Sequence, residues 1–225
     1  MYRKLNISVM PLTLIFVKTF RSVLWTVVSA WVLVLYGSSW AAESPVETIR
    51  ATVNQVVAVL QDPALRGAER RQARLAQMRA LVLPLFDAEE LARRSLGVHW
   101  RDRTADERQE FTELFTDLVE QSYSGTLDRY AAEVQVFYDR EQVEGDFAEV
   151  NTRVFDPAQN RTFAIDYRLH RSAEGWLIYD VVIENVSMVR NYRNQFARIL
   201  SRSSYEDLIQ AIKRRLEQPT STAAS

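Results

Sequence analysis

The sequence of 225 residues contains no cysteine and only two histidines, His99 and His170. The absence of cysteine excludes a disulfide framework, a thiol nucleophile and the lipidated cysteine of a bacterial lipoprotein. The two histidines lie on different predicted elements, with no second histidine or carboxylate at ligand spacing, so neither a metal site nor a cofactor is expected. Nucleophile-elbow, phosphate-loop and dinucleotide-binding motifs are also missing. In so short a chain, these absences disfavour the enzyme classes that depend on such motifs.

The first forty residues contain basic side chains but no acidic one. A largely apolar run from 23 to 36 follows the basic residues, and Ser39 and Ala41 stand at the small-residue positions that a signal peptidase needs. The run is too short to cross a bilayer comfortably, and the pattern is typical of a secretory signal. We therefore predict a signal peptide over 1–41 that is cleaved after Ala41, and a periplasmic location.

About 184 residues then remain, which suits one domain with a sizeable core. We predict a single domain over 42–217 and a disordered tail over 218–225. Removal of the signal leaves 24 basic and 29 acidic residues. This negative balance argues against nucleic acid, and against an anionic membrane surface, as the default partner.

The first half of the mature chain is predicted to be helical. Ser44 and Glu47 form a capping pattern around a proline, which predicts a helix from Pro45 to about 60. Similar starts occur at Asp87 and Thr104. The last of these helices has a broad apolar stripe that continues to about Tyr130.

Beyond Tyr130 the apolar period changes from helical to alternating, which predicts strands around 134–138, 148–154 and 163–169. The segment from Trp176 to Ile183 is almost continuously apolar, as expected of a strand covered on both faces. Ser187 and Ser204 then cap two further helices. We therefore predict an α+β domain in which several helices pack on a curved antiparallel sheet.

Asp180 is an acid within this apolar strand, with the same strand parity as Trp176, Ile178 and Val182. A buried carboxylate must be paired or protonated. It either accepts hydrogen bonds that fix the corner between strand and helix, or acts as a general base in an apolar pocket. The structural interpretation is favoured.

The region from 175 to 196 carries a family signature. In order, it contains Gly175-Trp176, Asp180, Val186-Ser187 and Asn191-Tyr192-Arg193. This pattern resembles the MlaC or toluene-tolerance family of periplasmic phospholipid-binding proteins, which are auxiliary components of ABC transporters. The resemblance implies a fold of the NTF2-like type around a deep apolar cavity that holds acyl chains. It also implies that Asp180 is structural, since the family keeps this residue without being known as enzymes.

On this resemblance, the apolar faces of the predicted elements line the cavity. The candidate lining residues are Leu118, Tyr123, Leu127, Val150, Phe163, Ile165, Tyr167, Trp176, Val186, Met188, Val189, Tyr192 and Phe196. Arg190 and Arg193 are candidates for contact with a lipid head group or a docking surface, because guanidinium groups match phosphate oxygens.

The implied function is that of a monomeric shuttle that carries phospholipid between the outer and inner membranes and so maintains outer-membrane lipid asymmetry. The implied partners are an inner-membrane ABC lipid transporter complex and an outer-membrane lipoprotein complex. Three alternatives stay open. The chain could carry hopanoid or another polycyclic lipid, it could be a small isomerase-like enzyme that uses Asp180, or it could be an adaptor without a ligand.

Overall fold

The computed structural model describes residues 44–129, 134–157 and 159–218, and it describes side chains up to 123 in the first of these ranges. The predicted signal peptide at 1–41 and residues 219–225 of the predicted tail lie outside the described residues, so both stay predictions. None of the described helices combines the length and the apolar character that a membrane crossing requires.

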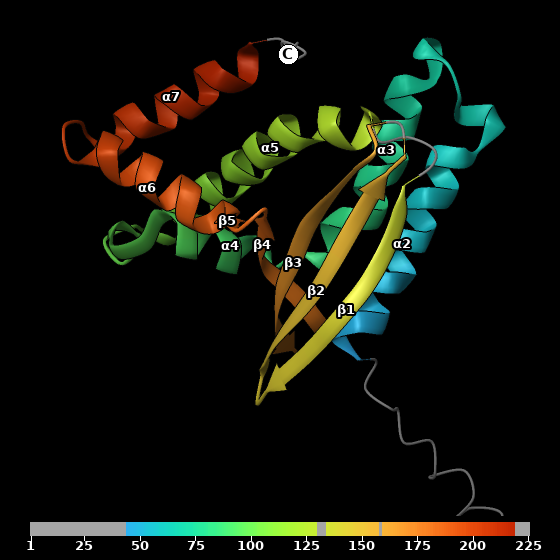
Figure 1. Ribbon diagram of the computed structural model, residues 1–225. Coiled ribbons are helices and arrows are strands. Elements are labelled where there is room, and N and C mark those ends of the chain that lie inside the picture. Colours follow the sequence, from blue (N-terminus) through green and yellow to red (C-terminus); the bar gives the residue numbers. More distant parts are fainter. Residues whose placement is uncertain (1–43, 130–133, 158, 219–225) are drawn as a thin grey trace, which may run out of the picture. The chain divides into compact units, whose positions relative to one another are not determined.

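The amino-terminal half of the described chain is helical, and its α-helices and short 3-10 turns (η) alternate (Figure 1). Their bounds are α2 (Pro45–Gln61), η1 (Pro63–Leu65), η2 (Ala68–Arg70), α3 (Arg71–Val82), η3 (Leu83–Leu85), α4 (Ala88–Leu96), η4 (Gly97–Trp100) and α5 (Ala105–Arg129).

The predicted helix starts are confirmed, because each capping side chain accepts the hydrogen bond that its position predicts. Ser44 Oγ accepts from Glu47 N, Asp87 Oδ1 accepts from Glu90 N, and Thr104 Oγ1 accepts from Glu107 N. The side chain of Glu107 in turn accepts a hydrogen bond from Thr104 N, which completes a reciprocal cap.

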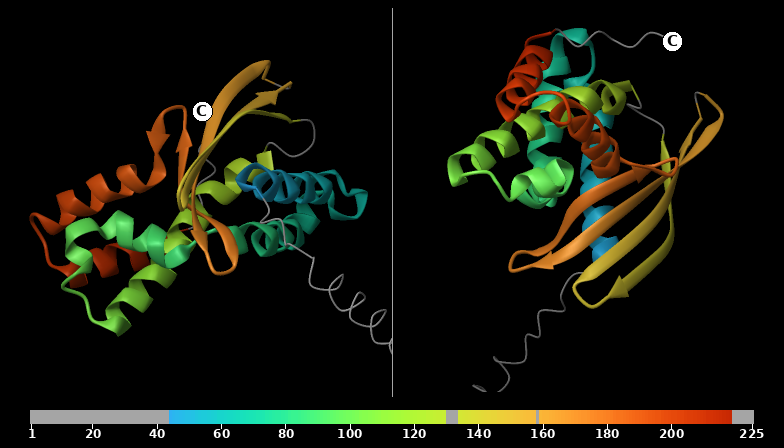
Figure 2. Two further views of the ribbon diagram at one scale, coloured as in Figure 1. Left: turned by 90° about the horizontal axis from the view of Figure 1, so that it is seen from below. Right: turned by 90° about the vertical axis from the view of Figure 1, so that its left-hand side faces the viewer.

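The second half of the described chain forms an antiparallel sheet followed by two helices. The strands lie in sequence order, and they are β1 (Gln135–Glu144), β2 (Phe147–Asp156), β3 (Arg161–Ser172), β4 (Gly175–Ile183) and β5 (Val186–Ser187). The helices are α6 (Met188–Leu200) and α7 (Tyr205–Glu217), capped by Ser187 and Ser204 as predicted. Together with the helices before it, this order confirms the α+β class, and the strands are visibly curved in Figure 2.

The pairing of β2 with β3 and of β3 with β4 shows which side chains share a face of the sheet. We call the face that carries Val150, Tyr167 and Val181 the apolar face. Val150 pairs with Tyr167 and Thr152 pairs with Ile165, so these four side chains share a face. Helix α2 contacts β1 and β2, and Ile49 of this helix is buried against the apolar face.

A register shift in β4 changes which side chains share that face. Leu169 pairs with Ile178, but Arg168 pairs with Asp180, which leaves Tyr179 as an extra residue. The prediction that Asp180 shares a face with Trp176 and Ile178 is therefore wrong, whereas Val182 does lie on the same side as Asp180. Asp180 points away from the apolar face, whereas Ile178 and Trp176 lie on it, because the bulge reverses the alternation between them.

Two apolar clusters result. The first joins α2 to the sheet and contains Ile49, Ala148, Val150, Leu169, Trp176 and Ile178. The second lies among the helices, with most of its members on α4, α5, α6 and α7. Phe86 packs against both clusters, and its neighbour Asp87 donates a backbone hydrogen bond of 3.0 Å to Ile178 O. This short segment therefore connects the two clusters at the edge of β4.

We predict that Phe115→Ala lowers the free energy of unfolding by about 3–5 kcal/mol. Phe115 is 1% exposed and stacks on Phe111, while its ring meets the ring of Tyr192 edge-on at 5.0 Å between centroids. Urea denaturation checks the value, with Val98→Ala as the control. Because Val98 is 74% exposed, its truncation should change stability by at most about 0.5 kcal/mol.

Candidate functional site

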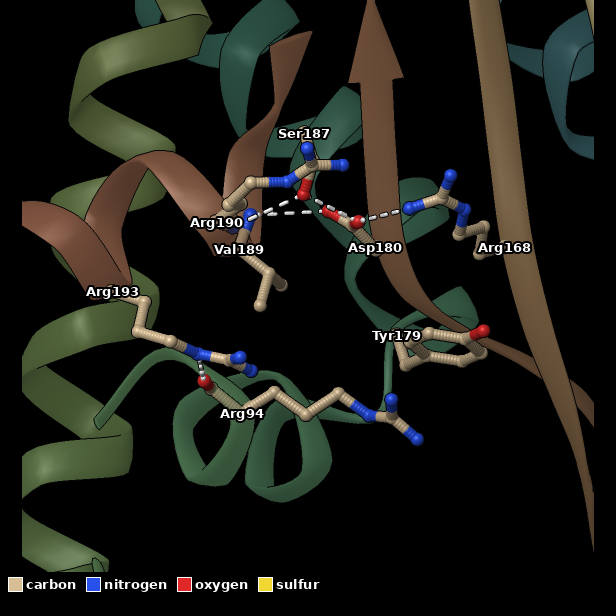
Figure 3. A pocket seen from close by; sticks show the side chains of 8 residues that line it. All are labelled: Arg94, Arg168, Tyr179, Asp180, Ser187, Val189, Arg190 and Arg193. Atoms are coloured by element: carbon tan, nitrogen blue, oxygen red, sulfur yellow. Dashed lines mark hydrogen bonds and ion pairs between the residues drawn. The ribbon is translucent and has the colours of Figure 1, made fainter. Parts of the chain in front are cut away.

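The buried carboxylate of Asp180 lies where strand β4 meets helix α6. It is 4% exposed. Its Oδ2 accepts hydrogen bonds from Ser187 Oγ at 2.7 Å and from an Arg168 Nη at 3.2 Å, and its Oδ1 accepts from Val189 N at 3.1 Å (Figure 3). Three donors from three segments therefore replace the water that the carboxylate loses on burial.

Ser187 extends this arrangement into the first turn of α6. Its hydroxyl donates to Asp180 and accepts from Arg190 N at 3.0 Å. The first backbone N–H groups of α6 thus bond to Asp180 or to a residue that Asp180 holds. The carboxylate fixes the direction in which α6 leaves the sheet.

Arg168 stands between two carboxylates on β2 and β4. Its Nε donates to Glu149 Oε2 at 3.1 Å, and its other contact is Asp180. The pKa of Glu149 is lowered by a hydrogen bond from Asn151, against the effect of burial, and further by Arg168. Burial lowers the pKa of Arg168, but the hydrogen bond to Glu149 and the charge of Asp180 raise it overall. Arg168 therefore stays charged and pairs with both carboxylates.

A pocket of about 350 Å³ opens beside Asp180, between β3, β4, α4 and α6, and we call it the arginine pocket. Figure 3 shows the residues that line it, which are Arg94, Arg168, Tyr179, Asp180, Ser187, Val189, Arg190 and Arg193. Four arginines and one carboxylate therefore line the same pocket, and of the four only Arg168 bonds to Asp180 among the described residues.

The expected cavity residues on the sheet lie together on the apolar face. Val150 and Trp176 are buried there, and Tyr167 packs against them while remaining half-buried. By register with Val154 and Thr152, Phe163 and Ile165 continue the same face along β3, and both are half-buried. Burial raises the pKa of Tyr167 well above its ordinary value, so its phenol stays neutral.

The expected cavity residues on helices belong to the other cluster. Leu118, Met188, Val189, Tyr192 and Phe196 are buried in it, and Tyr123 packs against it. Tyr192 donates from its hydroxyl to Ser122 Oγ at 3.1 Å, which ties α6 to α5. The sequence predicted that these residues and those of the sheet line one cavity, but the structure divides them between two apolar clusters.

Two expected lining residues lie elsewhere. Val186 follows the left-handed turn at Glu184 and Asn185 and is 60% exposed, whereas Ser187 beside it on β5 is buried. We therefore do not retain Val186 as a lining residue. Leu127 lies on α5, but its side chain is outside the described residues.

Three residues of the arginine pocket were missed by sequence reasoning, namely Arg94, Arg168 and Tyr179. They come from α4, β3 and β4, and only the fold brings them together. Arg94 stands beside Arg93 in the sequence, and nothing there distinguished it from its neighbour. The alternation in β3 did place Arg168 on the polar side, which was the only available signal.

Metal binding has no structural support in the part of the chain that the structure describes. No group of three or more histidine, aspartate or glutamate side chains is placed to hold an ion there. His170 lies 2.9 Å from Asp87 Oδ2 through its Nε2 atom, which is a single contact between β3 and the cap of α4.

Comparison with known proteins agrees with this architecture. A family model described as MlaC protein matches residues 50–214. A solved structure of a phospholipid-binding protein from Ralstonia solanacearum, in complex with a phospholipid, superposes with a TM-score of 0.67. It is 27% identical, and the match covers 78% of this chain and 96% of the Ralstonia chain.

A curated relative is the intermembrane phospholipid transport system binding protein MlaC of Haemophilus influenzae, which is 22% identical over 141 residues. That alignment covers 61% of this chain and 66% of the relative. It therefore spans slightly less than two thirds of the relative.

We predict that Asp180→Asn lowers the free energy of unfolding by about 2–3 kcal/mol. The amide places a donor where Asp180 now accepts, and it removes a charge that faces Arg168. Urea denaturation of the variant measures the loss. Asp139→Asn is the control, because the ion pair of Asp139 with Arg153 is largely exposed and should contribute at most about 1 kcal/mol. Equal losses in both variants would contradict a special role for the buried carboxylate.

Proposed function

Because the chain belongs to the MlaC family, we propose that it binds phospholipid and carries it between the inner and outer membranes as the periplasmic component of a Mla-type system. The observation that carries the proposal is the Ralstonia relative, whose match covers nearly all of that chain and which holds a phospholipid. The name of the Haemophilus relative, a binding protein of intermembrane phospholipid transport, supports the same role.

The apolar face of the sheet is the proposed place for acyl chains. Phe163, Ile165, Tyr167, Val181 and Ile183 lie on this face and are only half-buried. Their neighbours Val150 and Leu169 are fully buried. An apolar ligand laid along β3 and β4 would remove the partly exposed side chains from water, which is the main driving force for binding.

The strength of such binding explains why the carrier needs partners. Each buried methylene gains about 0.8 kcal/mol, so two chains of roughly sixteen carbons gain on the order of 25 kcal/mol before ordering costs. A loaded carrier would therefore not release its lipid into water. We propose an inner-membrane ABC lipid transporter complex and an outer-membrane lipoprotein complex as the sites of loading and release.

Periplasmic delivery in this proposal depends on the predicted signal over 1–41. The carrier then works as a monomer without a cofactor, with phospholipid as its cargo. Its role is to maintain the lipid asymmetry of the outer membrane.

An enzymatic role for Asp180 is less well supported by its surroundings. A general base needs a free lone pair within reach of the proton that it removes. Three of about four lone-pair positions of the Asp180 carboxylate already accept hydrogen bonds, and one of the donors is the guanidinium of Arg168. We therefore propose that Asp180 organises the corner and takes no part in catalysis.

We predict that the purified mature chain retains phospholipid and that Ile165→Glu abolishes retention. The substitution places a carboxylate on the proposed acyl-chain face, where burial without a partner is costly. Native mass spectrometry followed by organic extraction measures the bound lipid. Phe137→Glu is the matched control, because Phe137 pairs with Arg153 on the opposite face of the sheet and is 45% exposed.

The outcomes separate the alternatives. Diacyl phospholipid on the wild type and on Phe137→Glu, with none on Ile165→Glu, supports the proposal. Hopanoid in place of phospholipid would indicate a carrier of polycyclic lipid. A wild type that neither co-purifies with lipid nor extracts it from vesicles would refute the carrier and favour an adaptor.

A further inference from the structure

The arginine pocket holds positive charge that the described protein does not neutralise. In the described part of the chain, the guanidinium groups of Arg190 and Arg193 form no ion pair with a carboxylate. Arg94 shares Glu90 with Arg93, and Arg168 pairs with Asp180 and Glu149. Two of the four guanidinium groups are therefore left without a counter-charge in a concave site.

Arg193 is held in place although its side chain lies at the surface. Its Nε donates to Arg94 O at 2.6 Å, and its aliphatic stem passes over Gly97. Gly97 has a φ of 64°, which favours glycine, and its position lies in ordinary van der Waals reach of this stem. The terminal nitrogens of Arg193 are thereby directed along the wall of the pocket (Figure 3).

Arg94 is fixed in a similar way from the opposite side. Its Nε donates to Glu90 Oε1 at 2.7 Å, and its guanidinium carbon lies 4.0 Å from the centre of the Tyr179 ring. Among the described residues, these contacts leave its terminal nitrogens without an acceptor. Both arginine side chains are thus ordered before any ligand binds, so binding costs less conformational entropy.

Asp180, Ser187 and the first N–H groups of α6 are already bonded within the protein. Asp180 accepts three hydrogen bonds, and the backbone N–H groups of Val189 and Arg190 are bonded to Asp180 and Ser187. The start of α6 therefore offers these N–H groups to no ligand. The guanidinium groups of the pocket that do not bond to Asp180 are those of Arg94, Arg190 and Arg193, and these are the candidate donors.

We propose that the arginine pocket binds the phosphate group of a phosphate ester. Guanidinium forks match phosphate oxygens in pairs, and an oxyanion would supply the missing counter-charge. The volume of about 350 Å³ accommodates a phosphate with a small attached group. Val189 lines the pocket and also belongs to the buried helical cluster, so apolar residues begin directly at its wall.

The phosphate ester can come from two sources. One is the head group of the carried phospholipid, and in that case the inference rests on the proposed function. The other is a soluble phosphate ester, which would bind whether or not the chain carries lipid. The guanidinium chemistry is the same for both.

The test combines Arg190→Gln and Arg193→Gln in one variant and compares it with the wild type. The control combines Arg198→Gln and Arg202→Gln, which removes the same charge from exposed positions outside the pocket. Calorimetry measures binding of inorganic phosphate and sn-glycerol 3-phosphate to the delipidated protein. Native mass spectrometry measures retention of phosphatidylglycerol against diacylglycerol with the same acyl chains. Thermal unfolding verifies that all variants fold.

We expect the pocket variant to weaken phosphate binding, or the preference for phosphatidylglycerol over diacylglycerol, by about tenfold or more, because charge-assisted hydrogen bonds are lost. The control should match the wild type. An effect on the soluble phosphates without an effect on the lipid preference identifies a soluble ester as the source, and an effect on the lipid preference identifies the head group.

Equal behaviour of the pocket variant and the control in both measurements would overturn the inference. The proposed function fails separately, when the wild type retains neither phosphatidylglycerol nor diacylglycerol. A wild type that retains both lipids equally and binds no soluble phosphate would keep the carrier and exclude the phosphate pocket. A pair of Arg→Lys substitutions at 190 and 193, which keeps the charge but removes the forks, should give an intermediate loss.

Discussion

The carboxylate of Asp180 must receive hydrogen bonds because it is almost completely buried, and this requirement ties three segments together. Arg168 on β3, Ser187 on β5 and the backbone of Val189 on α6 each supply one donor. If any of these segments moved, a buried charge would lose part of its solvation. The start of α6, and with it one wall of the arginine pocket, is therefore held at Asp180, while Tyr192 and Phe196 pack the rest of the helix against its neighbours.

The bulge at Tyr179 lets strand β4 contribute to both sides of the sheet. Before the bulge, Trp176 and Ile178 pack with Ile49 of α2 on the apolar face. After it, Asp180 and Val182 point to the other side, and both are buried. A strand without a bulge would place all four side chains on one face, which explains why the almost continuous apolar sequence does not follow simple alternation.

Most secondary structure was predictable, because caps and periodicity are local signals. Ser44, Asp87, Thr104, Ser187 and Ser204 begin helices as their positions predict. The side of Asp180 was not predictable, since an extra residue such as Tyr179 leaves no clear trace in the alternation. The arginine pocket was only partly predictable. Arg190 and Arg193 stand beside a recognisable turn, but Arg94 joins them through the packing of α4 on α6, which depends on tertiary contacts.

Apolar burial and guanidinium hydrogen bonding recognise different parts of a lipid. The free energy gained by burial grows with the number of methylenes, so it holds any lipid with long chains and discriminates poorly between head groups. A hydrogen bond to a phosphate is directional, and it is lost completely when the phosphate is absent. In this fold the half-buried face along β3 and the fixed guanidinium groups beside Asp180 are built from different residues. On the two proposals, retention and selection of a ligand change independently, by substitutions on the sheet or at the start of α6.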